Sequence, residues 1–373
     1  MTATPETADA GTHEVSVLAQ ARVVDGIPMS GLLAAAAEPR AVILALHGGA
    51  VHSGYYDCPG HPDLSLLRTA AALGYTVLAL DRPGYGASHP HADELRSADR
   101  RVELVYGALR RHLGARSYGA GLFVWAHSSG CELGIRVATE QTLAAAHGFE
   151  LLGIELAGTG RAHQPVAHEL IGTIRRDLPP GSVRDLLWQP FALYPRELVG
   201  GAAIGSPSPP YEAEVVTRWP RHDFPTLAPR VRVPVHFTVA EHENVWRGDR
   251  SARDEIAAVF PRTTVRFDDQ PGAGHNLSLG HAARAYHLRA LAFVEECVVA
   301  RGNTFTPGSA AASMADTHES VDADAGDFAA ADVADNNGRT ATNPTSNGRG
   351  THARVGPRHG IAADPELAAG GTP

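Results

Sequence analysis

Lysine is missing from the sequence, in which all 32 basic side chains other than histidine are arginine. A P-loop needs a lysine on the phosphates, and a kinase-type site needs the lysine of its third strand. Pyridoxal phosphate enzymes and other Schiff-base enzymes need an amine nucleophile. The absence therefore excludes these classes. GC-rich coding, which favours arginine codons, is the simplest origin of the bias.

Basic side chains are also fewer than acidic ones. The 32 arginines face 41 acidic side chains, which gives a net charge of −9, and the arginines are dispersed along the chain. A nucleic-acid-binding surface needs a basic face or stripe to neutralise phosphates. We therefore expect no nucleic-acid partner.

Cysteine and long apolar runs are scarce as well. Cys58, Cys131 and Cys297 are odd in number and show no C-x-x-C spacing, so neither a disulfide framework nor a zinc knuckle is indicated. The first thirty residues lack a basic start followed by an apolar run, and no stretch of 18 consecutive residues is apolar. We expect a cytoplasmic protein without stable membrane insertion.

Composition divides the chain into four parts. Residues 302–373 are rich in Ala, Gly, Asp, Asn and Thr and bury too little apolar surface to offset the ordering entropy, so disorder is expected there and in residues 1–12. The remaining body is predicted to comprise a core, residues 13–160 and 231–301, and an inserted cap, residues 161–230.

Short apolar runs alternate with helix-spaced segments in the predicted core. Near-continuous apolar strands are typical of a sheet that is buried on both faces, and the alternation of strands and helices indicates parallel crossovers. The predicted class is thus α/β, with a mostly parallel, doubly wound sheet. Strands are expected as a pair within 14–36 with a turn at 25–26, and at 41–46, 76–80, 122–126, 151–156, 233–239 and 263–267; helices are expected at 62–73, 94–113, 130–146, 250–259 and 281–300.

The predicted cap combines many prolines with aromatic side chains. Aromatic rings on such an insertion suggest an apolar pocket wall suited to a hydrophobic acyl or alcohol group. The alternative is that the rings only attach the insertion to the core. The candidate pocket residues are Trp188, Phe191, Tyr194 and Trp219.

The motif that carries chemistry is AHSSG at residues 126–130, between an apolar strand and a predicted helix. It follows the G-x-S-x-G nucleophile elbow, with alanine at the first glycine. The serine of an elbow lies in a strained turn, and a bulky residue two positions away would collide with the neighbouring strand or helix. Ser128 is therefore the candidate nucleophile, although small residues are abundant enough here for chance matches.

A second loop can supply hydrogen-bond donors. The sequence HGGA at residues 47–50 leaves an apolar strand in a glycine-rich turn. A backbone amide of Gly49 or Ala50, together with the amide of Ser129, would form an oxyanion hole. The alternative is an ordinary tight turn between a strand and a helix.

Two further candidates complete an arrangement in chain order. Glu243 follows a late strand, and His275 lies between the last strand and a helix. This order of serine, acid and histidine resembles the α/β-hydrolase superfamily. The turn DRPGYGAS at residues 81–88 resembles the D-x-x-G-x-G-x-S turn of that superfamily, and the predicted cap follows the sixth strand.

The resemblance implies acyl transfer by a serine hydrolase that cleaves an ester or thioester of a small, partly hydrophobic molecule without a cofactor or metal. His275 would be the base and Glu243 the acid that orients it. The superfamily's pattern of glycine, two residues and aspartate maps onto residues 240–243 with both ends substituted, so Glu241 and Glu155 stay as alternatives. A serine at the elbow disfavours the dehalogenase and epoxide hydrolase branches, which need a carboxylate nucleophile.

Other readings of the residues remain open at this stage. An acyltransferase or a carbon–carbon bond hydrolase uses the same three residues, and a silent hydrolase fold can serve as a binding module. The run HPHADE at residues 89–94 resembles part of a metallo-β-lactamase-type ligand set but lacks the final histidine. The substrate's identity and the oligomeric state, including a homo-oligomer, are left open.

Overall fold

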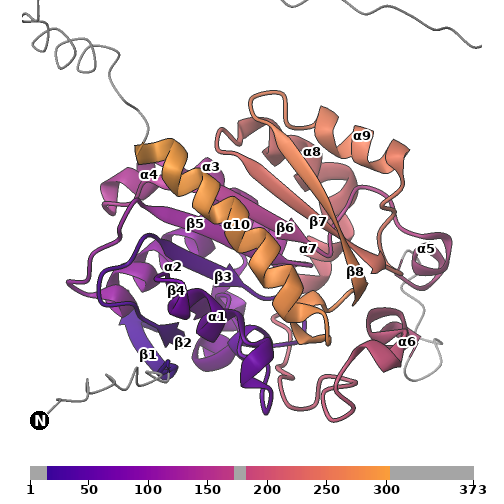
Figure 1. The fold of residues 1–373 in the computed structure, drawn as a ribbon, viewed down its shortest axis with the longest axis horizontal. Helices are drawn as coiled ribbons and strands as arrows, with labels where there is room; N and C mark the ends of the chain where they lie inside the picture. Colours follow the sequence, from indigo (N-terminus) through magenta and orange to yellow (C-terminus); the bar gives the residue numbers. More distant parts are fainter. Residues whose placement is uncertain (1–14, 172–181, 303–373) are drawn as a thin grey trace, which may run out of the picture. The chain divides into compact units, whose positions relative to one another are not determined.

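Within residues 15–171 and 182–302, which the computed structural model describes, eight strands form one sheet (Figure 1). The order across the sheet is β1-β2-β4-β3-β5-β6-β7-β8, and only β2 runs against its neighbours. The predicted α/β class and mostly parallel sheet are confirmed. The strands are β1 (Leu18–Val24), β2 (Ile27–Ala34), β3 (Val42–Leu46), β4 (Thr76–Leu80), β5 (Leu122–His127), β6 (Leu151–Ala157), β7 (Val235–His242) and β8 (Val265–Gly274).

The central strands are formed by the apolar runs. Every residue of β3, β4 and β5 is buried, as a sheet covered on both faces requires. The hairpin of β1 and β2 turns at Asp25 and Gly26, whose φ values of 48° and 82° are those of a turn with two left-handed residues. The last strand, predicted at 263–267, extends to Gly274 because its pairing with β7 resumes after a register shift.

Side-chain caps mark the start of α2 and α9. The Oγ of Ser97 accepts the N–H of Arg100 at the start of α2, and an Asp249 oxygen accepts the N–H of Ala252 at the start of α9. The helix predicted at 94–113 therefore begins only at residue 98, and the one predicted at 130–146 is divided at Glu140. The core helices are α1 (Leu66–Ala72), α2 (Ala98–Leu113), α3 (Gly130–Thr139), α4 (Gln141–Ala146), α9 (Arg250–Ala258) and α10 (Ala283–Gly302).

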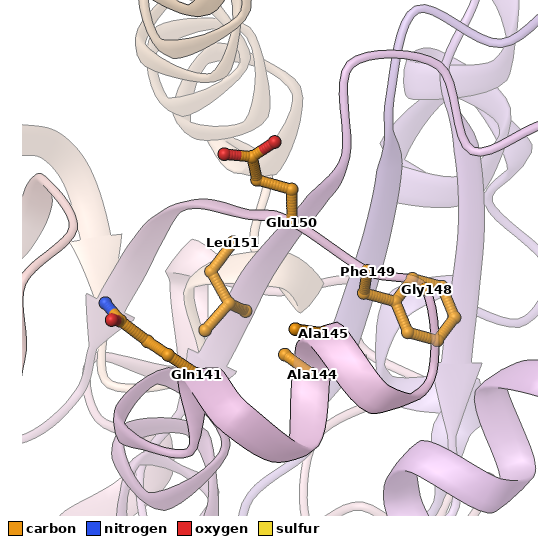
Figure 2. A pocket seen from close by; sticks show the side chains of 7 residues that line it. All are labelled: Gln141, Ala144, Ala145, Gly148, Phe149, Glu150 and Leu151. Atoms are coloured by element: carbon orange, nitrogen blue, oxygen red, sulfur yellow. The ribbon is translucent and has the colours of Figure 1, made fainter.

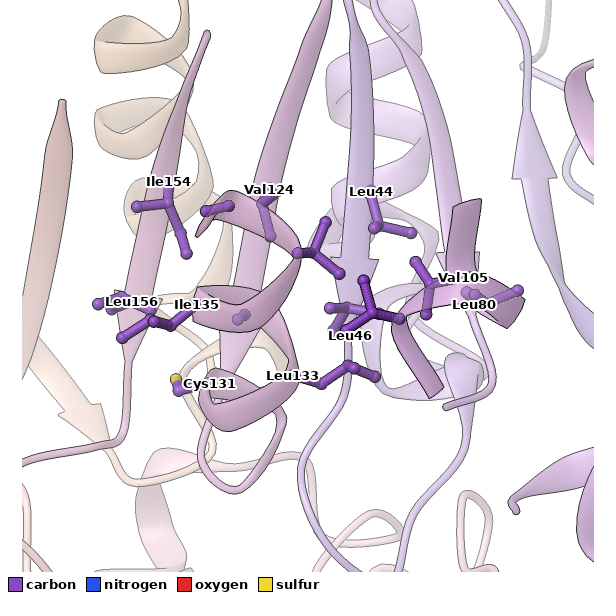
Figure 3. Close-up of a cluster of buried hydrophobic side chains, with 14 of the residues drawn as sticks. Leu44, Leu46, Leu80, Val105, Val124, Cys131, Leu133, Ile135, Ile154 and Leu156 are labelled. Carbon is purple, nitrogen blue, oxygen red and sulfur yellow. The ribbon is translucent and has the colours of Figure 1, made fainter. Parts of the chain in front are cut away.

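Helices cover both faces of the sheet and bury two apolar clusters. On one face α1 and α10 pack together, with Leu66 and Leu291 in the same cluster (Figure 1). On the other face α3 packs on β5 and β6 and α2 packs on β1 and β2, and Val105, Val124 and Ile135 belong to one buried cluster (Figure 3). Burial of this kind stabilises a fold by roughly 25 cal/mol per Å² of apolar surface.

The chain between β6 and β7, residues 158–234, is here called the β6–β7 segment. It contains the predicted cap, of which residues 172–181 lie outside the described ranges. The two ends predicted to be disordered, residues 1–12 and 302–373, also lie outside these ranges, except for Gly302, which ends α10. Among the described helices, none is long and apolar enough to cross a membrane. The segment's helices are α5 (Pro165–Ile171), α6 (Ser182–Trp188), α7 (Glu212–Arg218) and α8 (Phe224–Leu227).

Parallel order fixes where loops gather. The carboxyl ends of β3, β5, β7 and β8 lie along one edge of the sheet, because these strands run in the same direction. Residues that follow these strands are therefore brought together, and ligands of open α/β sheets bind at this edge. The predicted oxyanion turn, nucleophile, acid and histidine each follow one of these four strands.

Candidate active site

Ser128 occupies a strained turn directly between β5 and α3. Its φ is 53°, a left-handed value that a residue with a side chain rarely adopts, and its N–H donates to the Ala157 carbonyl at 2.9 Å. A Cβ on Gly130 would lie 2.4 Å from the His47 carbonyl oxygen, and one on Gly134 would lie 2.7 Å from the Ala126 Cβ. Small residues at positions 126, 130 and 134 thus let the helix start against the ends of β3 and β5.

Ser128, His275 and Glu243 are brought together from three separate loops. The Ser128 Oγ lies 3.1 Å from Nε2 of His275, and Nδ1 of the same ring lies 3.0 Å from both carboxylate oxygens of Glu243. His275 is only 2% exposed. The distances are those of a serine activated by a histidine whose tautomer is set by an acid.

The two alternative acids lie elsewhere. An oxygen of Glu241 accepts the N–H of Gly272 at 2.7 Å, on the surface. Glu155 is buried in the sheet, where its carboxylate bonds the ring of His236 and accepts the Thr238 hydroxyl at 2.7 Å. Neither carboxylate bonds His275, so the geometry favours Glu243.

His275 is held from behind by a second histidine. Nε2 of His127 donates to the His275 carbonyl at 2.8 Å, and the His127 ring stacks on Tyr55. Burial, followed by the repulsion that two neighbouring imidazolium rings would exert, keeps the pKa of His127 well below its usual value, so the ring stays neutral. Gly158 leaves space for both rings, because a Cβ there would lie 2.7 Å from Nε2 of His127 and 3.2 Å from Cε1 of His275.

The predicted oxyanion turn passes beside the nucleophile. A Cβ on Gly48 would lie 3.0 Å from the Ser128 Cβ, so the turn is in contact with the elbow. Among the described residues, the N–H groups of Gly49 and Ser129 have no protein acceptor. The N–H of Ala50 points to the Tyr85 hydroxyl at 3.3 Å. Of the three predicted donors, Gly49 and Ser129 are thus the free ones.

A buried ion pair adjoins this turn. The Arg82 guanidinium, 1% exposed, donates to both carboxylate oxygens of Glu212 in the β6–β7 segment, at 3.2 and 2.9 Å. Burial alone would raise the pKa of Glu212, but the charge and hydrogen bonds of Arg82 outweigh it and hold this pKa below its usual value. The sequence gives no signal for this pair, because the two residues are isolated charges 130 positions apart.

Two cavities open at Ser128 and His275. The larger, about 360 Å³, is mostly apolar and lies under α7, and the smaller, about 190 Å³, is bordered by the glycine turn. Of the predicted pocket residues, Trp219 lines the larger cavity and Trp188 the smaller. Sequence reasoning missed other lining residues of the larger cavity: His163, Leu187, Glu212, Val215, Val245 and Trp246.

The other two predicted pocket residues border neither cavity. The Tyr194 hydroxyl accepts the N–H of Asn276 at 3.3 Å, next to the candidate base. Phe191 is 40% exposed at the surface. Tyr194 supports the His275 loop, and the prediction of a pocket role for these two rings is not matched by their positions.

Two other candidate regions, both among the described residues, lack a grouping of catalytic or metal-ligating side chains. A hollow of about 410 Å³ between α4 and β6 is lined by Gln141, Glu150 and apolar side chains, without a nucleophile beside a base (Figure 2). In the run 89–94, His89 contacts the Gly84 carbonyl and His91 contacts Glu94. Within the described parts of the chain, no three His, Cys, Asp or Glu side chains are grouped to hold a metal ion.

Comparison with protein families agrees with the fold. The model described as "Alpha/beta hydrolase family" matches residues 42–288, more than half of the chain. The chain therefore belongs to the alpha/beta hydrolase family. A search of curated proteins found no match.

Solved structures with the same fold include proteins described as a phospholipase, an esterase and a hydrolase. A bacterial membrane phospholipase A has a TM-score of 0.54 at 17% identity, covering 75% of this chain and 86% of its own. A carboxyl esterase from Bacillus coagulans has a TM-score of 0.54 at 15% identity, with coverages of 76% and 99%. A 2-hydroxy-6-oxo-6-phenylhexa-2,4-dienoate hydrolase from Rhodococcus sp. strain RHA1 has a TM-score of 0.52 at 17% identity, with coverages of 75% and 98%. Such low identities show the fold alone.

Proposed function

We propose that the protein is a serine hydrolase that cleaves a carboxylic ester or thioester of a partly hydrophobic small molecule. The observation that carries the proposal is the contact of Ser128 Oγ with Nε2 of His275 at 3.1 Å, with Nδ1 of that ring on Glu243, at the mouth of an apolar cavity. Nucleophile, base and orienting acid in hydrogen-bond reach are the parts that nucleophilic acyl transfer needs.

In the proposed reaction the Ser128 oxygen attacks the substrate carbonyl while His275 takes its proton. The carbonyl oxygen becomes an oxyanion, which the N–H groups of Gly49 and Ser129 stabilise. His275 then gives its proton to the leaving alcohol or thiol, and an acyl-enzyme forms on Ser128. Water, deprotonated by His275, attacks the acyl carbon, and His275 then returns this proton to the Ser128 oxygen as the acid leaves. Glu243 holds the ring tautomer and stabilises the imidazolium in both steps.

The two cavities support the proposed substrate class. The larger cavity, about 360 Å³, falls within the range of small-molecule sites, and Val215, Trp219 and Trp246 give it an apolar wall. It suits a hydrophobic acyl group, while the smaller cavity of about 190 Å³ suits a compact alcohol or thiol part. The β6–β7 segment supplies much of both walls and would act as the cap that selects substrates.

The proposal is tested by intact-mass analysis after incubation with a fluorophosphonate probe. The parent protein should gain one adduct, Ser128→Ala none, and His275→Ala should react far more slowly. A panel of p-nitrophenyl esters and acyl thioesters, run with and without an added alcohol, then separates hydrolysis from acyl transfer. A parent that stays unlabelled by this probe and by a smaller one would refute the proposal.

A further inference from the structure

The Arg82 guanidinium joins the β6–β7 segment to the turn that carries the candidate oxyanion donor. Besides its two bonds to Glu212, its Nη2 donates to the Gly48 carbonyl at 2.9 Å and contacts the Ser129 Oγ at 3.2 Å. The Ser129 hydroxyl in turn donates to Glu212 at 2.5 Å. The Arg82–Glu212 pair therefore contacts Gly48, whose carbonyl precedes the Gly49 N–H, and Ser129, whose N–H is the other proposed oxyanion donor.

The Gly48 carbonyl is held by two donors. Nε2 of His47 accepts the N–H of Arg82 at 3.0 Å, so Nδ1 carries the proton and donates to the Gly48 carbonyl at 2.8 Å. Arg82 is the second donor. In a trans peptide the carbonyl and the following N–H point in opposite directions. Fixing the Gly48 carbonyl on the Arg82 side therefore turns the Gly49 N–H away from Arg82.

Glu212 is what keeps Arg82 in this place. A buried guanidinium needs a counter-charge, because desolvation of a lone ion is costly. Glu212 supplies it through a bidentate contact, and it lies on α7, outside the elements that form the elbow. Its carboxylate also faces the turn, since a Cβ on Gly49 would lie 3.1 Å from Oε1. Pairing with Arg82 offsets the negative charge that would otherwise oppose an oxyanion.

We propose that Glu212 is a positioning residue of the oxyanion hole: through Arg82 and Ser129 it fixes the peptide whose Gly49 N–H stabilises the oxyanion. The β6–β7 segment thereby contributes to the transition state as well as to the substrate cavity. This inference rests on the proposed serine hydrolase function.

The test compares Glu212→Ala and Glu212→Gln with a matched control, Glu214→Ala. The Glu214→Ala substitution removes the same charge from the same helix, but the Glu214 side chain is 72% exposed. The readouts are the second-order rate of Ser128 labelling by a fluorophosphonate, and competition of that labelling by an octyl trifluoromethyl ketone and by the corresponding alcohol. The ketone forms an oxyanion adduct and the alcohol only fills the cavity. Circular dichroism at the assay temperature shows that each variant is folded.

We expect Glu212→Ala to slow labelling by about 10 to 100-fold, which is no more than the decrease in rate that follows removal of a whole oxyanion donor. Its affinity for the ketone should fall in parallel, while its affinity for the alcohol changes less than threefold. Glu212→Gln, whose oxygen can still accept from Arg82 and Ser129 but which lacks the counter-charge, should be labelled at a rate between those of Glu212→Ala and the parent. Glu214→Ala should behave as the parent.

The remaining outcomes separate the two proposals. If the parent itself is not labelled, the proposed function fails and this inference fails with it. If the parent is labelled and Glu212→Ala is labelled at the same rate, only this inference is overturned. An equal loss of ketone and alcohol affinity would show that Glu212 shapes the cavity, and it would also overturn the inference.

Discussion

Nδ1 of His275 lies 3.0 Å from each of the two carboxylate oxygens of Glu243. The Oε1 atom also accepts the N–H of Val245 at 2.8 Å, so the carboxylate is fixed by its own loop before it meets the ring. This arrangement leaves the histidine one tautomer, with Nε2 free to accept the proton of Ser128.

Replacement of this acid should therefore remove most of the activity. Glu243→Gln keeps the shape of the side chain but not the charge that stabilises the imidazolium, and we expect a loss of about 10³ to 10⁴-fold in kcat on a p-nitrophenyl ester. The control is Glu241→Gln, at the exposed acid that bonds Gly272. Equal rates for both variants would contradict the assignment of Glu243.

The space that Gly158 leaves beside His275 is expected to be needed for the reaction, as the charge of Glu243 is. Gly158→Ala places a Cβ close to both His127 and His275 at a φ of 62°, so the base should be displaced and the labelling rate of Ser128 should fall at least tenfold. The control is Gly26→Ala, which has a φ of 82° but no atom within 4 Å of the new Cβ. That variant carries the backbone strain alone, about 1–2 kcal/mol, and should lose stability without losing labelling rate.

The larger cavity should set the length of the acyl chain. Val215→Phe fills part of it, and we expect the ratio of kcat/KM for an octanoyl over an acetyl p-nitrophenyl ester to fall about tenfold. Val166→Phe, at a position 62% exposed on α5, should leave this ratio unchanged. An unchanged ratio in Val215→Phe would place the acyl group elsewhere.

A buried histidine outside the site should make stability depend on pH. Burial would lower the pKa of His236, but the charge and hydrogen bonds of Glu155, together with Asp268, raise it from 6.5 to about 9. Because the folded pKa is the higher one, the stabilisation is complete below pH 6.5 and is lost as the pH rises through about 9. The shift corresponds to about 3 kcal/mol as an order of magnitude.

Urea unfolding at pH 6, 8 and 10 tests this expectation. The parent should lose stability over this range by more than His236→Gln does, while the control His91→Gln, at a half-buried histidine on the surface, should follow the parent. Comparison with a variant is needed because buried thiols such as Cys58, whose pKa burial raises to about 12, also destabilise the fold at alkaline pH. Parallel curves for the parent and His236→Gln would contradict the prediction.

The sequence predicts the core of this fold well, because buried parallel strands are nearly continuous apolar runs. It also places Ser128, Glu243 and His275 at strand ends, where the parallel order brings them together. It could not pair Arg82 with Glu212, since contacts between distant isolated charges leave no local pattern. Nor could it separate Trp219, which faces the cavity, from Phe191, which faces solvent, because both stand next to a proline and after a helix in an irregular segment.

Three of the four tryptophans of the chain border the two cavities: Trp188, Trp219 and Trp246, while Trp125 is buried in the sheet. The intrinsic ultraviolet emission of the protein therefore arises largely from the site itself. Entry of a ligand displaces water from these indoles and changes their emission, so occupancy can be followed optically in the unlabelled protein, even for a molecule that is never turned over.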